Sequence, residues 1–228
     1  MVKIIRIRTF LVAMLCFYFF VALADTSAAD LPSSQSGQAV EAETIRLNQW
    51  LDTQFGEYLD FSPLAKTRLG IKTDYDILDD NSDDMDDVYV KWRMQSATKM
   101  ERLFNRANLT EEGKRSFDLW LRLSDEGQKS VRFRFHRYVF GRRGPHTSLP
   151  NGLINYHKVS SLSDMQAYVS RLRQSGRYLM QALDKAKLSA SKGIRAPYFD
   201  YQLALSQIQR VTQGRPFTDL GESPIWKD

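Results

Sequence analysis

Cysteine, histidine and recognisable catalytic motifs are all scarce in this chain of 228 residues. The single cysteine, Cys16, has no partner for a disulfide, so stability must come from ordinary burial of a core. The three histidines are His136, His146 and His157, and no two of them form the HExxH pair of a zinc helix. Neither a GxSxG nucleophile elbow nor a GxxxxGK[ST] phosphate loop occurs. A Ser-His-Asp triad built from distant positions stays open, although no local motif supports it.

The N-terminus has the pattern of a cleavable signal peptide. Lys3, Arg6 and Arg8 form a positive segment, and residues 9–24 (TFLVAMLCFYFFVALA) carry no charge. This apolar run is short for a bilayer span, which needs roughly 20 residues. Small residues at Ala22 and Ala24 fit a cut before Asp25, and a second possible cut precedes Asp30. We therefore predict a signal peptide at 1–24, a periplasmic or secreted protein, and no stable membrane anchor after cleavage; a retained N-terminal anchor is the alternative.

The basic charge of the whole chain is partly a property of this leader. Three of the 32 Lys and Arg residues lie in it, which leaves 29 against 27 acidic residues, or +2. A nearly neutral exported protein gives no reason to expect nucleic acid as a partner.

The rest of the chain predicts an all-α fold, a multi-helix array with an irregular or short β-like segment near 128–152. Residues 25–42 are rich in Ser, Ala and Gly and predict a disordered leader. Residues 43–214 form the helical domain, because apolar residues recur at three- and four-residue spacing in most of it. Residues 215–228 have no such period and predict an irregular tail. Ser62-Pro63 and Thr110 have the character of helix starts, and Ser163 is expected to cap a long helix that ends near Gly193.

The segment near 128–152 combines a two-residue period with arginines. Val131, Phe133 and Phe135 alternate with Arg132, Arg134 and His136, which favours a half-buried strand or an extended loop. Gly141, Gly144, Pro145, Pro150 and Gly152 follow and argue against a helix. Arginine forks in this segment suit carboxylates of a peptide or other anionic substrate, whereas a plain strand with a charged outer face is the structural alternative.

An acidic run from Asp74 to Asp87 invites comparison with a calcium loop. Asp79, Asn81 and Asp83 match the first three ligand positions of an EF-hand, but Asp84 stands at the glycine position and Val90 at the closing glutamate. Acids before a helix also favour its positive end without any metal, so we expect a solvated loop.

The segment GRRGPHTSLPNGLINYH is the strongest candidate for a site. Gly144-Pro145 fixes the backbone there and is expected to expose the ring of His146 beside Thr147, although a purely structural turn is an equal alternative.

Two longer stretches resemble one known family. RLNQWLDTQFGEYLDFSPLAKTRLGIKTDYDILDD and FRFHRYVFGRRGPHTSLPNGLINYHKVSSLSDMQAYVSRL are similar in order and spacing to the bacterial domain-of-unknown-function 885 proteins, from about Ile45 to about Thr212. Members are typically longer and helical, many are exported, and their second half carries an HExxH-like zinc helix that serves oligopeptide hydrolysis.

The resemblance implies a substrate-binding role for six residues. Gly144, Pro145, His146 and Thr147 match the family's glycine-proline-histidine segment, and Asn155 and His157 match its downstream positions. Arg142-Arg143 stands where relatives often carry smaller or amide residues. No zinc ligand set is present, so the expectation is a substrate-cleft-forming N-terminal portion of an exported metallopeptidase-like protein, without catalytic residues or a cofactor of its own, whose partners are a peptide substrate or a separately encoded C-terminal half. The alternative is a stand-alone peptide- or partner-binding module; a metal-free hydrolase is a third hypothesis.

Overall fold

Every regular element that the structure describes is helical. The computed structural model describes residues 32–219 and 221–227, and the predicted signal peptide lies outside these ranges. The elements are α1 (Pro32–Leu59), α2 (Pro63–Arg68), α3 (Asp83–Leu103), η1 (Arg106–Asn108), α4 (Glu111–Ser130), η2 (Val131–His136), α5 (Pro145–Tyr156), α6 (Leu162–Ser191), α7 (Tyr198–Thr212) and α8 (Pro224–Lys227). No strand occurs in the described ranges, so the predicted all-α fold is confirmed. None of the helices in them has the length and apolarity needed to cross a membrane.

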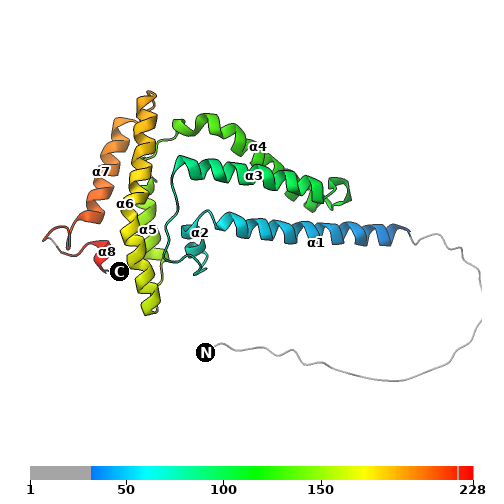
Figure 1. The fold of residues 1–228 in the computed structure, drawn as a ribbon, viewed down its shortest axis with the longest axis horizontal. Helices are drawn as coiled ribbons and strands as arrows, with labels where there is room; N and C mark the ends of the chain where they lie inside the picture. Colours follow the sequence, from blue (N-terminus) through cyan, green and yellow to red (C-terminus); the bar gives the residue numbers. More distant parts are fainter. Residues whose placement is uncertain (1–31, 220, 228) are drawn as a thin grey trace, which may run out of the picture.

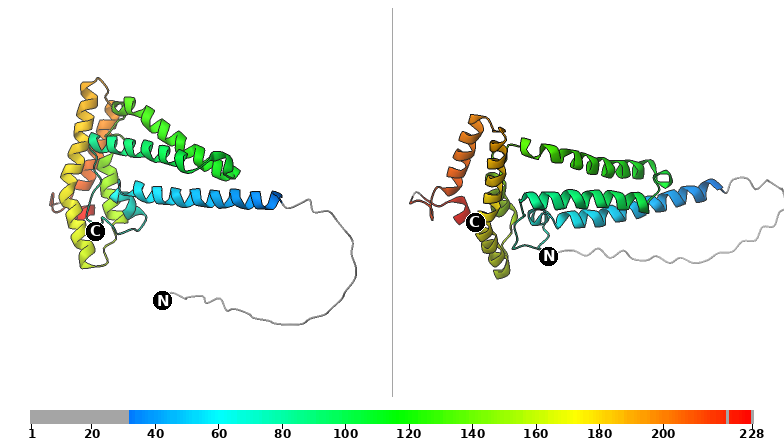
Figure 2. Two further views of the ribbon diagram at one scale, coloured as in Figure 1. Left: turned by 45° about the vertical axis from the view of Figure 1, so that its right-hand side comes forward. Right: turned by 45° about the horizontal axis from the view of Figure 1, so that its top comes forward.

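The helices form two groups that run in different directions (Figure 1). Helices α1, α3 and α4 lie along one another and project to one side; we call them the arm. Helices α2, α5, α6 and α7 form the base, in which α5 packs against α2, α6 and α7. The views in Figure 2 show the same separation of arm and base.

Each group has its own apolar core. The arm buries Leu47, Met100, Phe104, Leu109 and Phe117, with Trp50, Leu51, Trp120 and Leu121 packed around them. The base buries Leu64, Leu78, Leu149, Leu153, Tyr168 and Tyr178. The two clusters share no residue, so the arm and the base are held together by other contacts.

Side-chain caps set the starts of several helices. The hydroxyl groups of Ser62, Ser82, Thr110 and Ser161 each accept a hydrogen bond from the backbone N–H three residues further on. Such caps satisfy donors that the helix itself leaves free. The predicted caps at Ser62 and Thr110 are confirmed, whereas the cap of α6 is Ser161 rather than Ser163.

Residues 131–136 contradict the expected strand. They form the 3-10 helix η2 at the end of α4. A three-residue period replaces the two-residue one: Arg134 is half-buried against Asp87, while Phe133 remains 50% exposed. Val131, Arg134 and Phe135 are the partly buried side chains of this segment.

The glycines and prolines between 141 and 152 do not prevent a helix either. Pro145 occupies the first turn of α5, where its missing N–H costs nothing, and the helix continues through Pro150. The expectation of a break holds only for residues 137–144, which are irregular.

The two ends of the described chain also have more structure than the sequence suggests. Helix α1 begins at Pro32, inside the segment 25–42 that predicts a disordered leader; residues 25–31 lie outside the described ranges. Ala39, Glu41 and Ala42 favour helix, and extending a formed helix is less costly than nucleating one. In the tail, Pro224 begins the short α8.

Candidate functional site

A cleft of about 790 Å³ lies where the arm meets the base. We call it the α5 cleft, because the first residues of α5 form part of its wall. Its other walls come from the start of α3, the end of α4, η2 and α6. The residues that line it include Asp83, Asp86, Phe133, Arg134, Arg137, Tyr138, Arg143, Gly144, Pro145, Ser148 and Lys185.

The ring of His146 occupies the space that a side chain at position 144 would need. A Cβ atom at Gly144 would lie 2.7 Å from His146 Nδ1 and 2.6 Å from the carbonyl oxygen of Val139. Gly144 precedes α5 as its N-cap, and the Thr147 hydroxyl donates to the Gly144 carbonyl at 2.9 Å. The glycine-proline-histidine-threonine segment thus builds the first turn of α5.

His146 is buried, contrary to the expected exposed ring. It is 5% exposed and its ring centroid lies 5.7 Å from that of Phe140. Gln207 of α7 donates from its amide nitrogen to the Arg142 carbonyl, which leaves its oxygen 2.8 Å from His146 Nε2. Nε2 therefore carries the proton, and the buried Nδ1 has no hydrogen-bond partner in the part of the chain that the structure describes. Gly144 and Pro145 line the cleft, while the imidazole lies behind them against α7.

His157 lies at the other end of α5 and belongs to a different network. Its ring stacks on Tyr75 with centroids 4.0 Å apart. Arg171 donates to His157 Nδ1 at 3.1 Å, so Nε2 carries the proton that faces the Asp164 carbonyl at 3.1 Å. His157 follows His146 by eleven positions along α5, which places the two residues roughly 16 Å apart along the helix axis.

Asn155 is exposed and donates to Asn151 on the same helix. The six predicted site residues therefore do not form one site: the group from Gly144 to Thr147 adjoins the α5 cleft, and Asn155 and His157 do not line it.

Arg171 is the central residue of the His157 network, and sequence reasoning missed it. Its side chain is fully buried, and it donates to the carbonyls of Ile77 (3.0 Å), Pro63 (3.3 Å) and Asp74 (3.3 Å). Burial lowers the pKa of the guanidinium from its usual value, an effect that nearby Tyr75, Asp79 and Asp76 oppose. One feature of the sequence could have identified it: Arg171 follows Tyr168 by three positions and so lies on the apolar face of a helix.

Two further side chains of α6 form hydrogen bonds with the chain that leads toward the arm. Gln174 accepts from the Leu78 N–H at 3.1 Å and donates to the Asp76 carbonyl at 2.7 Å. Gln181 accepts from the Asn81 N–H at 3.0 Å. One face of α6 thus holds the chain that leads from α2 into α3.

Two side chains of the acidic run from Asp74 to Asp87 also bond to other elements of the fold. Asp79 accepts from the Ser62 hydroxyl at 2.7 Å and from the Leu64 N–H at 2.8 Å, at the start of α2. Asp86 accepts from Lys185 of α6 at 2.6 Å. Within the described ranges no three His, Cys, Asp or Glu side chains are grouped as metal ligands would be. These acids hold elements together rather than surrounding a shared centre.

Asp164 is a second buried charge beside His157. Lys72 donates to both of its carboxylate oxygens at 2.8 Å, and Ser160 donates through its N–H and its hydroxyl. The Lys72 bond first, and the Ser160 bonds after it, hold the pKa of Asp164 well below its usual value.

The charge of the α5 cleft comes mainly from arginines of the segment after α4. Arg134 is paired with Asp87, whereas Arg137 and Arg143 have no ion pair with any residue that the structure describes. Phe133 and Tyr138 in the same wall are 50% and 53% exposed. Across the cleft, Lys185 compensates Asp83 and Asp86. Two unpaired guanidinium groups beside exposed aromatic rings suit an anionic ligand with some apolar surface.

These features define an all-helical protein with an arginine-rich, partly aromatic cleft between two helical groups. A family model described as "Bacterial protein of unknown function (DUF885)" matches residues 63–226. The chain belongs to this family. Searches of curated proteins and of solved structures found no match.

Proposed function

We propose that this chain forms the wall of a peptide-binding cleft in a metallopeptidase-like protein and does not itself cleave the peptide. The observation that carries the proposal is the α5 cleft, in which Arg137 and Arg143 offer unpaired guanidinium groups beside Gly144 and Pro145. A volume of about 790 Å³ lies within the range of small-ligand sites and suffices for a few residues of a peptide.

Zinc does not fit the residues that the structure describes. His146 and His157 lie at opposite ends of α5, and His157 uses both ring nitrogens in hydrogen bonds. In the proposal, the metal and the base that activates water come from residues other than those that the structure describes.

Helix α7 provides a surface on which the part that carries those residues can pack. Tyr198, Tyr201, Leu205 and Ile208 recur at spacings of three and four residues, and all four side chains are exposed. Figure 1 shows α7 at the outer side of the base, away from the arm. An apolar stripe of this kind is usual where another protein surface packs.

Peptide binding can be tested with two proline-containing hexapeptides whose C-termini are amidated. One carries two glutamates and the other two glutamines. We expect the glutamate peptide to bind in calorimetry at least about tenfold more tightly, and the Arg137→Ala, Arg143→Ala double variant to lose this preference. Arg115→Ala, an exposed arginine of the arm, is the matched control. Equal binding of both peptides by the wild-type chain would reject the cleft assignment.

A stand-alone binding module is the second candidate, favoured by the two complete apolar cores. The two candidates differ in their need for a partner. Leu205→Lys and Ile208→Lys remove two apolar side chains of the α7 stripe. If this variant is a folded monomer that still binds the glutamate peptide, the result supports the module. Two outcomes support the larger assembly. Either these changes abolish peptide binding, or the wild-type chain self-associates and the changes make it monomeric.

We also propose export, which rests on the sequence of residues 1–24. The mass of the protein recovered from a periplasmic fraction tests it, since cleavage before Asp25 or Asp30 gives distinct masses. A full-length product in the cytoplasm would contradict the proposal.

A further inference from the structure

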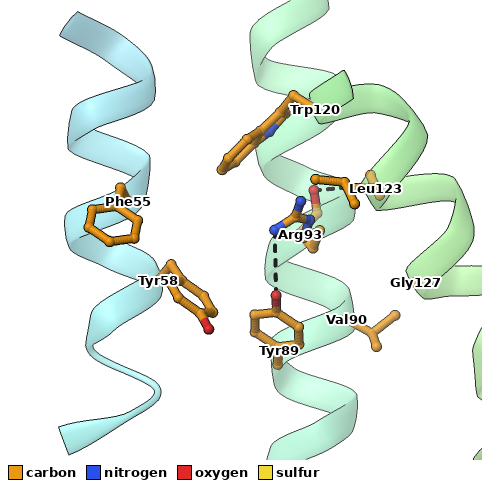
Figure 3. A pocket seen from close by; sticks show the side chains of 9 residues that line it. Phe55, Tyr58, Tyr89, Val90, Arg93, Trp120, Leu123 and Gly127 are labelled. Carbon is orange, nitrogen blue, oxygen red and sulfur yellow. Dashed lines mark hydrogen bonds between the residues drawn. The ribbon is translucent and has the colours of Figure 1, made fainter. Parts of the chain in front are cut away.

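A second cavity, of about 370 Å³, opens between the three helices of the arm (Figure 3). We call it the Arg93 groove. Phe55 and Tyr58 of α1 form one wall, and Tyr89 and Arg93 of α3 with Trp120 and Leu123 of α4 form the other. Figure 3 shows the Arg93 guanidinium between Trp120 and Tyr89, with the two α1 rings opposite.

Arg93 is held in place but keeps most of its donors unused. Its guanidinium carbon lies 4.6 Å from the centre of the Trp120 ring, and one terminal nitrogen is 3.4 Å from the Tyr89 hydroxyl. The Nε atom is buried, and none of the residues that the structure describes is its hydrogen-bond partner. Elsewhere in the arm, Arg46 pairs with Glu43 and Arg106 with Asp118, whereas no carboxylate in the described ranges pairs with Arg93.

The acid nearest along α1 is already engaged. Glu57 accepts from Trp92 Nε1 at 2.9 Å and from the Gln54 amide at 2.9 Å. Because Arg93 lines the groove and pairs with no carboxylate among the described residues, its terminal N–H groups can donate to a ligand that supplies the acceptors. The planar fork of a guanidinium matches a carboxylate, and the surrounding rings match an apolar group.

We propose that the Arg93 groove binds a carboxylate joined to an aromatic or branched apolar group. The carboxylate accepts from Arg93, and the apolar group lies between Phe55, Tyr58 and Trp120. Such a ligand is either the C-terminal residue of a peptide or a free organic acid. The inference does not depend on the α5 cleft, although Tyr89, Val90 and Gly127 border both cavities.

The test is a titration with N-acetylphenylalanine and N-acetylphenylalanine amide, followed by tryptophan fluorescence and by the indole N–H signal of Trp120. We expect saturable binding of the acid and binding of the amide weaker by about tenfold or more. Phenylacetate serves as a third probe: binding as tight as that of N-acetylphenylalanine identifies free acids as the ligand class, and much weaker binding identifies peptide C-termini.

Variants separate this site from the fold and from the α5 cleft. Arg93→Met should lose the preference for the acid, and Arg93→Lys should retain only part of it, because lysine cannot form the fork. Phe55→Ala, at a side chain that is 49% exposed, should weaken binding without unfolding the arm. The Arg137→Ala, Arg143→Ala variant should bind the probe as the wild-type chain does. Equal affinity for acid and amide, no saturation, or full binding by a folded Arg93→Met variant would overturn the proposal.

Discussion

At the scale of single residues, Arg171 forms hydrogen bonds with several segments of the base at once. Of its backbone acceptors, the Pro63 carbonyl belongs to the first turn of α2 and the carbonyls of Asp74 and Ile77 belong to the chain between α2 and α3. Its fourth partner, His157, is the C-cap of α5. Replacing it with methionine keeps much of the apolar stem but leaves buried acceptors without a donor. We expect Arg171→Met to lower the free energy of unfolding by about 3 kcal/mol in urea titrations. Arg173→Met, on the exposed side of α6, should change it by less than about 0.5 kcal/mol; equal effects would show that Arg171 only fills space.

Asp164 gives the protein a predictable response to acid. Its pKa is lowered in the folded state, chiefly by Lys72, so the unfolded state takes up a proton there first as the pH falls. The stabilisation is therefore complete above the ordinary value of 3.8 and is lost progressively below it. We expect the stability difference between the wild-type chain and Asp164→Asn, measured by urea unfolding, to be largest near neutral pH and to shrink below about pH 4. Asp184→Asn removes an exposed carboxylate of α6 and is the control. A difference independent of pH would contradict the ion-pair account.

At the scale of elements, the start of α5 depends on a position without a side chain. A methyl group at Gly144 would meet both the Val139 carbonyl and the His146 ring, and the ring is fixed by Gln207 of α7. Gly144→Ala should therefore lower the free energy of unfolding by about 1–3 kcal/mol and disturb the contact between α5 and α7. A methyl group at Gly141 would have its nearest neighbouring atom 3.7 Å away, so Gly141→Ala should be tolerated. Thermal unfolding, with the His146 ring signal in NMR as a local probe, compares the two.

Elements with a local cause were predictable from the sequence, and those with a tertiary cause were not. Ser62-Pro63 and Thr110 set helix starts through bonds within one turn, which a sequence window contains. Val131–His136 continue α4 as a 3-10 helix in which Arg134 pairs with Asp87, 47 residues away, so the local two-residue period was misleading. In the candidate site, the segment from Gly144 to Thr147 adjoins the α5 cleft, but its backbone is an ordinary extended N-cap followed by the first turn of α5 rather than the unusual backbone that the sequence predicted. The predicted exposure of the His146 ring was wrong, because the ring is buried against Gln207 of α7, a residue 61 positions away.

At the scale of the whole molecule, arm and base are joined through polar contacts rather than a shared apolar core. The face of α6 that carries Arg171, Gln174 and Gln181 holds the chain entering α3, and Lys185 binds Asp86 in the first turns of α3. On the other side, η2 follows α4 and contacts α6 of the base, while its Arg134 pairs with Asp87 of α3. These links enclose the α5 cleft, so its shape depends on both groups being folded.

The last prediction tests whether these links make arm and base one cooperative unit. Replacing Trp226 with phenylalanine leaves Trp50, Trp92 and Trp120, all in the arm, as fluorescent reporters. In this background Leu153→Ala opens a cavity in the core of the base, where Leu153 is 1% exposed, and should cost about 2–5 kcal/mol. If the links transmit this loss, the tryptophan-detected urea transition shifts together with the transition seen by circular dichroism. Leu47→Ala, in the arm core, is the matched variant, and the two effects should add because the clusters share no residue. A tryptophan transition that Leu153→Ala leaves in place would show that the arm unfolds independently, and that the α5 cleft lies between two units that can separate.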